Sequence, residues 1–241
     1  MIMEINKDIV KTIVAIGGGE LRLNETFCID KYIVGLSSKE NPKVLFIPTA
    51  SGEAEGYIET VNRVYGDELG CFVNTLKILT ETPPSDNEIK DMILSSDIIY
   101  VGGGNTAKMM AAWKERNITH SLWQAYNNGV ILSGLSAGSI CWFEYGYSNS
   151  HLEETGESFL VKGLGMIPAL HCPHYNEHPE FDEFMKTQNM PAFAIEDNCA
   201  LIFQNGSYKV VKSNDSANAF LLTNNNGNIE KHIIDTLLHQ L

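Results

Sequence analysis

The chain has few positive charges and no long apolar run. It carries 17 Lys and Arg against 30 Asp and Glu, and only three residues are arginine: Arg22, Arg63 and Arg116. Binding nucleic acid needs clustered Lys and Arg, so the net charge of -13 argues against that partner. No apolar segment approaches the ~20 residues that cross a bilayer, and Met1–Thr12 has no apolar core of signal-peptide length. We therefore expect no membrane association and a cytoplasmic location.

Cysteine is also scarce. The five cysteines are scattered, odd in number and without C-x-x-C spacing: Cys28, Cys71, Cys141, Cys172 and Cys199. This pattern favours reduced, mostly buried thiols over a disulfide framework or a zinc site. The chain also shows no internal repeat, low-complexity tract or linker. Its 241 residues therefore predict one domain over residues 1–241, without a metal.

The first half of the chain alternates short apolar runs with amphipathic stretches. The predicted strands are Val10–Ile16, Lys43–Pro48, Thr75–Leu79, Asp97–Val101 and Gly129–Leu132. The predicted helices are Glu25–Ser37, Tyr57–Leu69, Asn87–Leu94, Thr106–Arg116 and Ser121–Asn127. This alternation predicts an α/β fold with a mostly parallel sheet covered by helices on both faces. In such folds the ligand site lies at the carboxyl ends of the strands.

The pattern changes after Cys141. Glu144–Gly163 is polar and aromatic without clear periodicity, which predicts a long loop that lines the site. An apolar strand within Gly165–His174 and a short helix at Pro179–Lys186 are expected next. From Phe193 onward, apolar runs separated by Asn-Gly pairs predict C-terminal β-hairpins.

The most informative segment is Gly129–Phe143, GVILSGLSAGSICWF. An apolar run ends in Gly134-Leu-Ser136-Ala-Gly138, and a helical segment of small residues follows. This is the pattern of a nucleophile elbow, in which a serine lies on a tight strand-to-helix turn. The glycines two residues either side of Ser136 leave room for that turn. The exposed hydroxyl then lies beside free helix N–H groups that can stabilise an oxyanion.

A serine nucleophile needs a base, and the base needs an acid to orient it. His174 is the best candidate base, because it follows a predicted strand and Pro173 stiffens its approach; His171 and His178 are rivals. The spacing leaves the acid open among Glu144, Glu153, Glu154, Glu157, Glu196 and Asp197.

The turn Gly102–Gly104 offers backbone N–H groups close to this site. Its sequence lacks the spacing of the known phosphate-binding loops. We therefore expect its N–H groups to face a carbonyl oxygen, and nucleotide binding is the weaker interpretation. Gly17–Gly19 forms a second such turn, for which a structural role is sufficient.

Three motifs in this order resemble those of the S51 serine peptidases, the family of dipeptidase E and cyanophycinase: VGGGNT at 101–106, GLSAGS at 134–139 and PHY at 173–175. The resemblance extends from Val10 to about Phe203. It implies a flavodoxin-like fold akin to class I glutamine amidotransferases, with serine replacing the cysteine nucleophile. It also implies hydrolysis of short peptides through an acyl-enzyme, without a cofactor.

By the same resemblance, Ser136 is the nucleophile, His174 is the base, and Gly103 and Ala137 supply the oxyanion hole. The position of the family's acid falls on His151–Glu154, where Glu154 or Glu153 fits, and Asp197 is a further alternative. An esterase or amidase with the same triad, or a non-catalytic binding protein on the same scaffold, are the other hypotheses. A homodimer is compatible with the sequence.

The chain departs from this family in one respect. Aspartyl dipeptidases of the family recognise a substrate carboxylate with arginines that follow the catalytic histidine, but no arginine follows Arg116 here. The matching stretch instead carries Glu177, Glu180, Asp182 and Glu183. Since an acidic pocket repels an aspartyl side chain, we expect a neutral or basic N-terminal residue, or a free α-amino group held by an acid.

Overall fold

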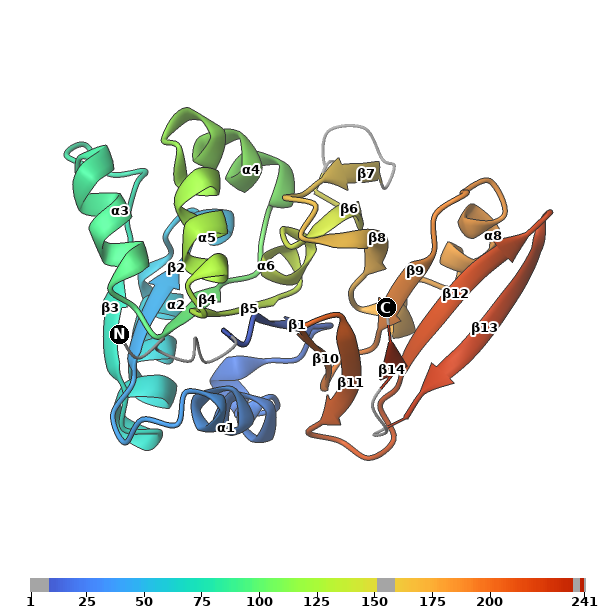
Figure 1. Ribbon diagram of the computed structural model, residues 1–241, viewed down its shortest axis with the longest axis horizontal. Coiled ribbons are helices and arrows are strands. Elements are labelled where there is room, and N and C mark those ends of the chain that lie inside the picture. The colour runs from blue at the N-terminus through green and yellow to red at the C-terminus, as the bar shows by residue number, and fades with distance from the viewer. Residues whose placement is uncertain (1–8, 151–158, 236–238, 241) are drawn as a thin grey trace, which may run out of the picture.

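The computed structural model describes residues 9–150, 159–235 and 239–240, which form two β-sheets with flanking helices (Figure 1). The first sheet has the order β14-β11-β10-β1-β5-β4-β2-β3. Its strands are β1 (Thr12–Ile16), β2 (Lys43–Ile47), β3 (Phe72–Thr75), β4 (Ile98–Val101), β5 (Ile131–Leu135), β10 (Cys199–Gln204), β11 (Ser207–Lys212) and β14 (His239–Gln240). Strands β1 to β5 are parallel, and the other three continue the sheet in antiparallel pairs.

Helices cover both faces of the parallel strands, as the alternation predicts. They are α1 (Phe27–Leu36), α2 (Glu55–Val61), which continues as a π-helix (Asn62–Glu68), α3 (Asp86–Leu94), α4 (Thr106–Glu115), α5 (Ile118–Asn127) and α6 (Ala137–Ile140). In β1, Ile13 and Ala15 share one apolar cluster with α3, α4 and α5. Val14 and Ile16 share the opposite cluster with α1 and α2. Alternate residues of the strand thus face opposite apolar clusters. Because both faces of the sheet are covered, every position of such a strand is apolar. None of the helices within the described ranges is long and apolar enough to cross a membrane.

The second sheet, in the order β13-β12-β9-β8-β6-β7, was not expected. Its strands are β6 (Phe143–Ser148), β7 (Phe159–Lys162), β8 (Ile167–Cys172), β9 (Ala192–Ile195), β12 (Ala219–Asn225) and β13 (Asn228–Ile234), with α8 (Phe181–Met185) beside them. The predicted loop over Glu144–Gly163 is therefore wrong at β6 and β7, which pair with each other. Gly146 weakens the strand signal of β6, but a Cβ there would lie 2.3 Å from Ile140 Cγ2. This glycine is required by its close packing against Ile140, and the strand propensity of the local sequence gives no sign of that contact.

The predicted third strand also needs correction, because β3 covers Phe72–Thr75 and not Thr75–Leu79. Leu76 and Ile78 are buried, so their apolar character reflects core packing outside a strand. The carboxylate of Glu53 accepts the backbone N–H groups of residues 78 and 79, the latter at 2.8 Å. A side chain thus satisfies backbone donors that a sheet partner would otherwise bind.

Two C-terminal hairpins are confirmed. The turn between β10 and β11 has Asn205 and Gly206 at φ 48° and 84°, and the turn between β12 and β13 has Asn226 and Gly227 at φ 53° and 88°. Positive φ at both central positions is the reason for the Asn-Gly pairs.

A buried carboxyl group lies between α1 and the π-helix. Asp30 is fully buried, and its two oxygens accept hydrogen bonds of 2.8 Å from Tyr65 Oη and Thr26 Oγ1. Burial raises the pKa of Asp30 to about 7, and the two hydrogen bonds offset only part of that effect. A group of this kind makes folding depend on pH.

We expect the free energy of unfolding to fall as the pH rises from 3.8 to about 7. In this range folded Asp30 holds a proton that the unfolded chain lacks, so raising the pH favours the unfolded state. Asp30→Asn keeps the polar contacts without titrating, and it should remove up to ~1.4 kcal/mol per pH unit of that slope. Urea denaturation across this range measures the slope. Asp91→Asn, at an exposed position of α3, is the control and should keep the wild-type slope. Equal slopes for Asp30→Asn and wild type would contradict the prediction.

Candidate active site

The predicted site residues lie at the carboxyl ends of strands from both sheets. The turn Gly17–Gly19 follows β1, Gly102–Gly104 follows β4 and Ser136 follows β5; His174 and Asp197 follow β8 and β9. The ends of parallel strands are the expected place for a site in this architecture. The second sheet thus supplies the histidine and the carboxylate, and the first supplies the serine and the glycine turns.

Ser136 has the backbone of a nucleophile elbow, with φ 55° and ψ -114°. Its N–H donates to the Ile16 carbonyl at 3.0 Å, which fixes the turn against β1. A Cβ on Gly134 would lie 2.1 Å from the Gly138 carbonyl oxygen, and a Cβ on Gly138 would lie 2.0 Å from that of Val101. Both glycines are therefore required by backbone contact. Strain of this kind persists only where the surroundings hold it in place.

His174 and Asp197 form a hydrogen-bonded pair. His174 Nδ1–H donates to Asp197 Oδ1 at 2.6 Å, and this bond lowers the pKa of the Asp197 carboxyl. Asn176 holds the carboxylate from the other side. It donates from Nδ2 to Asp197 Oδ2 and accepts the Asp197 N–H at Oδ1, both at 2.9 Å. A Cβ on Gly18 would lie 1.8 Å from Asp197 Oδ1, so the glycine turn after β1 makes room for the pair.

Ser136 and His174 line one small cavity of about 30 Å³, together with Ala137 and Gly104. The Ser136 hydroxyl makes no hydrogen bond to any described residue. The contacts of a catalytic serine often tighten only once substrate is bound. The free hydroxyl, the histidine and the cavity are thus arranged for attack on a small substrate.

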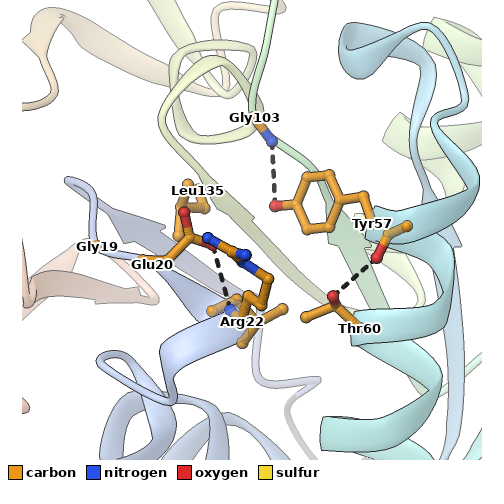
Figure 2. Close-up of a pocket in the computed structure, with 9 residues that line it drawn as sticks. Gly19, Glu20, Arg22, Tyr57, Thr60, Gly103 and Leu135 are labelled. Atoms are coloured by element: carbon orange, nitrogen blue, oxygen red, sulfur yellow. Dashed lines mark hydrogen bonds between the residues drawn. The ribbon is translucent and has the colours of Figure 1, made fainter.

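The backbone donors beside Ser136 differ in availability. The N–H groups of Ala137 and Gly104 make no hydrogen bond within the described part of the chain, and both residues line the serine cavity. The N–H of Gly103 donates to Tyr57 Oη at 3.3 Å (Figure 2). The geometry therefore favours Ala137 and Gly104 as oxyanion donors, and the role expected for Gly103 stays a prediction.

A second cavity of about 390 Å³ has Gly103 in its lining (Figure 2). It is lined by Gly19, Glu20, Leu21, Arg22, Gly56, Tyr57, Thr60, Gly103 and Leu135. The Arg22 guanidinium makes no hydrogen bond or ion pair with a described residue. A search for arginines after the histidine misses Arg22, because it follows β1 and only the fold brings it into the same cavity as Gly103.

Most of the acidic stretch after His174 is engaged. Glu180 accepts from Tyr147 Oη at 3.1 Å and from His178 at 3.0 Å. Asp182 contacts Tyr175 and Lys231, and Glu183 pairs with Lys186. Of these four carboxylates, Glu177 alone lines the serine cavity, within the part of the chain that is described. The predicted acidic character of the site thus depends on one residue.

The other candidates for base and acid are placed differently. His171 is fully buried, hydrogen-bonded to the Phe193 carbonyl and to Ser139, and burial lowers its pKa to about 3. Glu196 accepts the Asn218 N–H at 2.7 Å. Glu153, Glu154 and Glu157 lie outside the described residues. Of the candidate acids that the structure describes, Asp197 is the one hydrogen-bonded to His174.

Comparison with known proteins gives one family. The sequence model of Peptidase family S51 matches residues 13–211. The chain is 34% identical over 218 residues to the uncharacterized peptidase YgaJ of Bacillus subtilis strain 168, covering 88% of this chain and 91% of the relative. It is 24% identical over 185 residues to an uncharacterized peptidase of Pasteurella multocida strain Pm70, covering 73% of this chain and 87% of that relative.

Two solved structures share the fold. One is a peptidase from an acI-B1 Actinobacterium, with TM-score 0.73 and 19% identity over 96% of this chain and 97% of the other. The second is described as a candidate peptidase E of Listeria monocytogenes EGD-e, with TM-score 0.65 and 21% identity over 84% of this chain and 98% of the other.

Proposed function

Because this chain belongs to peptidase family S51, we propose that it is a serine peptidase that cleaves short peptides through an acyl-enzyme on Ser136. One observation carries the proposal. The strained elbow presents the Ser136 hydroxyl to a cavity that it shares with His174, whose far ring nitrogen is held by Asp197. Nucleophile, base and orienting acid are the parts that acyl transfer needs.

The reaction follows from this arrangement. Ser136 Oγ attacks the scissile carbonyl carbon while His174 Nε2 takes the hydroxyl proton. Asp197 holds the imidazole in the tautomer that leaves Nε2 free and stabilises the imidazolium. The tetrahedral oxyanion accepts hydrogen bonds from the Ala137 and Gly104 N–H groups. His174 then protonates the leaving amine, and it activates the water that releases the acyl group.

Charges in the two cavities support a specificity for small peptides. Glu177 lies in the serine cavity, where it favours a free α-ammonium group or a basic side chain over an aspartyl residue. Arg22 and Gly103 line the larger cavity, where Arg22 favours a carboxylate such as the peptide's own C-terminus. A short peptide carries both charges at its ends.

A panel of dipeptides and tripeptides with Asp, Leu or Lys first, as acids and as C-terminal amides, tests this specificity. We expect kcat/KM to be about tenfold lower for Asp than for Leu or Lys, because Glu177 repels the aspartyl carboxylate. We expect it to be about tenfold lower for the amides, because they lack the carboxylate that Arg22 favours; a tenfold change corresponds to ~1.4 kcal/mol. Arg22→Gln should remove the difference between acid and amide, whereas Arg116→Gln, outside both cavities and without contact to Arg22, should not. A clear preference for Asp at the first position would overturn the specificity. Hydrolysis of esters without hydrolysis of any peptide would overturn the peptidase.

A further inference from the structure

The Tyr57 hydroxyl contacts the glycine turn beside Ser136, and the mechanism above does not use it. Tyr57 lies on α2, and its ring packs edge to face on Phe46 with centroids 5.1 Å apart. Its Oη accepts the Gly103 N–H at 3.3 Å (Figure 2). A Cβ on Gly102 would lie 2.9 Å from Tyr57 Cε1, so the ring is directly against the turn.

The two ends of this turn are fixed by backbone contacts. The Gly102 N–H donates to the Ile47 carbonyl at 3.2 Å, and the Asn105 N–H donates to the Ala50 carbonyl at 2.7 Å. Between these two contacts lies the Gly103 N–H, and within the described structure its one hydrogen bond is to the Tyr57 hydroxyl. This bond fixes the peptide plane between residues 102 and 103, because the Gly103 N–H lies in that plane. Since glycine has wide conformational freedom, fixing this plane limits the orientations open to the next one, between residues 103 and 104.

That peptide plane carries the Gly104 N–H. Gly104 lines the cavity that contains Ser136, and its N–H makes no hydrogen bond within the described residues. Rotation at Gly103 would turn this donor away from the serine. We propose that Tyr57 is a positioning residue, whose hydroxyl holds Gly103 so that the Gly104 N–H faces the oxyanion.

This inference rests on the proposed function. The phenol acts as acceptor toward Gly103, and it is neutral because burial raises the pKa of Tyr57 to about 12. Preorganised donors of this kind are worth more in the transition state than in the bound substrate. Loss of the Tyr57 hydroxyl should therefore lower kcat and leave KM nearly unchanged.

Tyr57→Phe tests the assignment, because it keeps the ring on Phe46 and removes only the hydroxyl. We expect kcat for the best short peptide to fall about tenfold, with KM within a factor of two and an unchanged thermal midpoint. Affinity for a peptide aldehyde, which forms a tetrahedral adduct on serine, should fall in parallel. Tyr126→Phe is the matched control: the Tyr126 hydroxyl on α5 makes no hydrogen bond to a described residue, and this variant should match wild type.

The outcomes separate the two proposals. Wild-type kcat and aldehyde affinity in Tyr57→Phe would overturn the positioning role and leave the peptidase standing. A loss of thermal stability at unchanged kcat would also overturn it, because that result shows a purely structural role. A wild-type protein that neither cleaves peptides nor binds the aldehyde would overturn both proposals.

Discussion

Ser136→Ala is expected to lower kcat for short peptides about 10⁶-fold, the scale on which a serine peptidase loses activity without its nucleophile. The reason is local: without Oγ, the pair His174–Asp197 has no hydroxyl to deprotonate. The fold should remain, because the Ser136 hydroxyl makes no hydrogen bond in the described structure. Steady-state hydrolysis measures the first effect, and thermal denaturation measures the second.

Contaminating peptidase activity is excluded by purifying both proteins in the same way. Residual activity in Ser136→Ala above about 1% of wild type, with purity confirmed, would exclude Ser136 as the nucleophile. If Ser136→Ala lost activity and its circular dichroism spectrum were that of an unfolded protein, the loss of activity would reflect unfolding and not the loss of the nucleophile. Ser136→Cys, which restores a nucleophilic atom on the same turn, should then keep measurable activity if the elbow is the reacting site.

Asp197→Asn is expected to lower kcat about 10⁴-fold, the effect of replacing a triad carboxylate by its amide. An amide at position 197 can donate to His174 Nδ1. That contact favours the tautomer protonated at Nε2, which cannot take a proton from Ser136. Asn176 still contacts position 197 in this variant, so the geometry should persist. The kcat/KM profile against pH measures the effect over the full titration of the histidine.

Glu153→Gln and Glu154→Gln are the matched variants, because the resemblance to the family pointed to these residues as alternative acids. Each should keep kcat within about threefold of wild type if Asp197 is the orienting acid. A 10⁴-fold loss in either of them, with Asp197→Asn near wild type, would transfer the role of acid to that residue.

The nucleophile elbow was predictable from sequence because its requirements are local. A strand, a turn and a helix follow each other within Gly129–Phe143, and the glycines around Ser136 are needed for contacts inside that segment and with the turn after β4. The parallel strands were predictable for a similar reason, since each short apolar run is followed by its own helix. The α/β architecture and the C-terminal hairpins are accordingly confirmed.

The sequence offered Asp197 among several candidate acids but could not select it, because its contact with His174 depends on how strands pair. Asp197 meets His174 because β9 lies next to β8, with Phe193 opposite His171. This pairing belongs to the second sheet. That sheet was not predicted, because the sequences of β6 and β7 have only weak strand signals. Arg22, which follows β1, and Tyr57, on α2, were missed because only the tertiary fold brings them near Gly103. Both lie more than 70 residues before Ser136 in the chain.

The charge of the site also differs from what the sequence suggests. Counting acids after His174 overstates the negative field, because Glu180, Asp182 and Glu183 have partners. Counting arginines after His174 understates the positive field, because Arg22, in the short segment after β1, lines the larger cavity together with Gly103. The proposed specificity therefore rests on the charges that line the two cavities, Glu177 and Arg22.

The most direct test of the central claim is to react the protein with a fluorophosphonate and to measure its intact mass. If His174 and Asp197 activate Ser136, the wild-type protein gains one adduct per chain, peptide mapping places it on Ser136, and Ser136→Ala gains none. The Asp197→Asn protein should react much more slowly. An unmodified wild-type protein, or an adduct on another residue, would contradict the claim that Ser136 is the activated nucleophile.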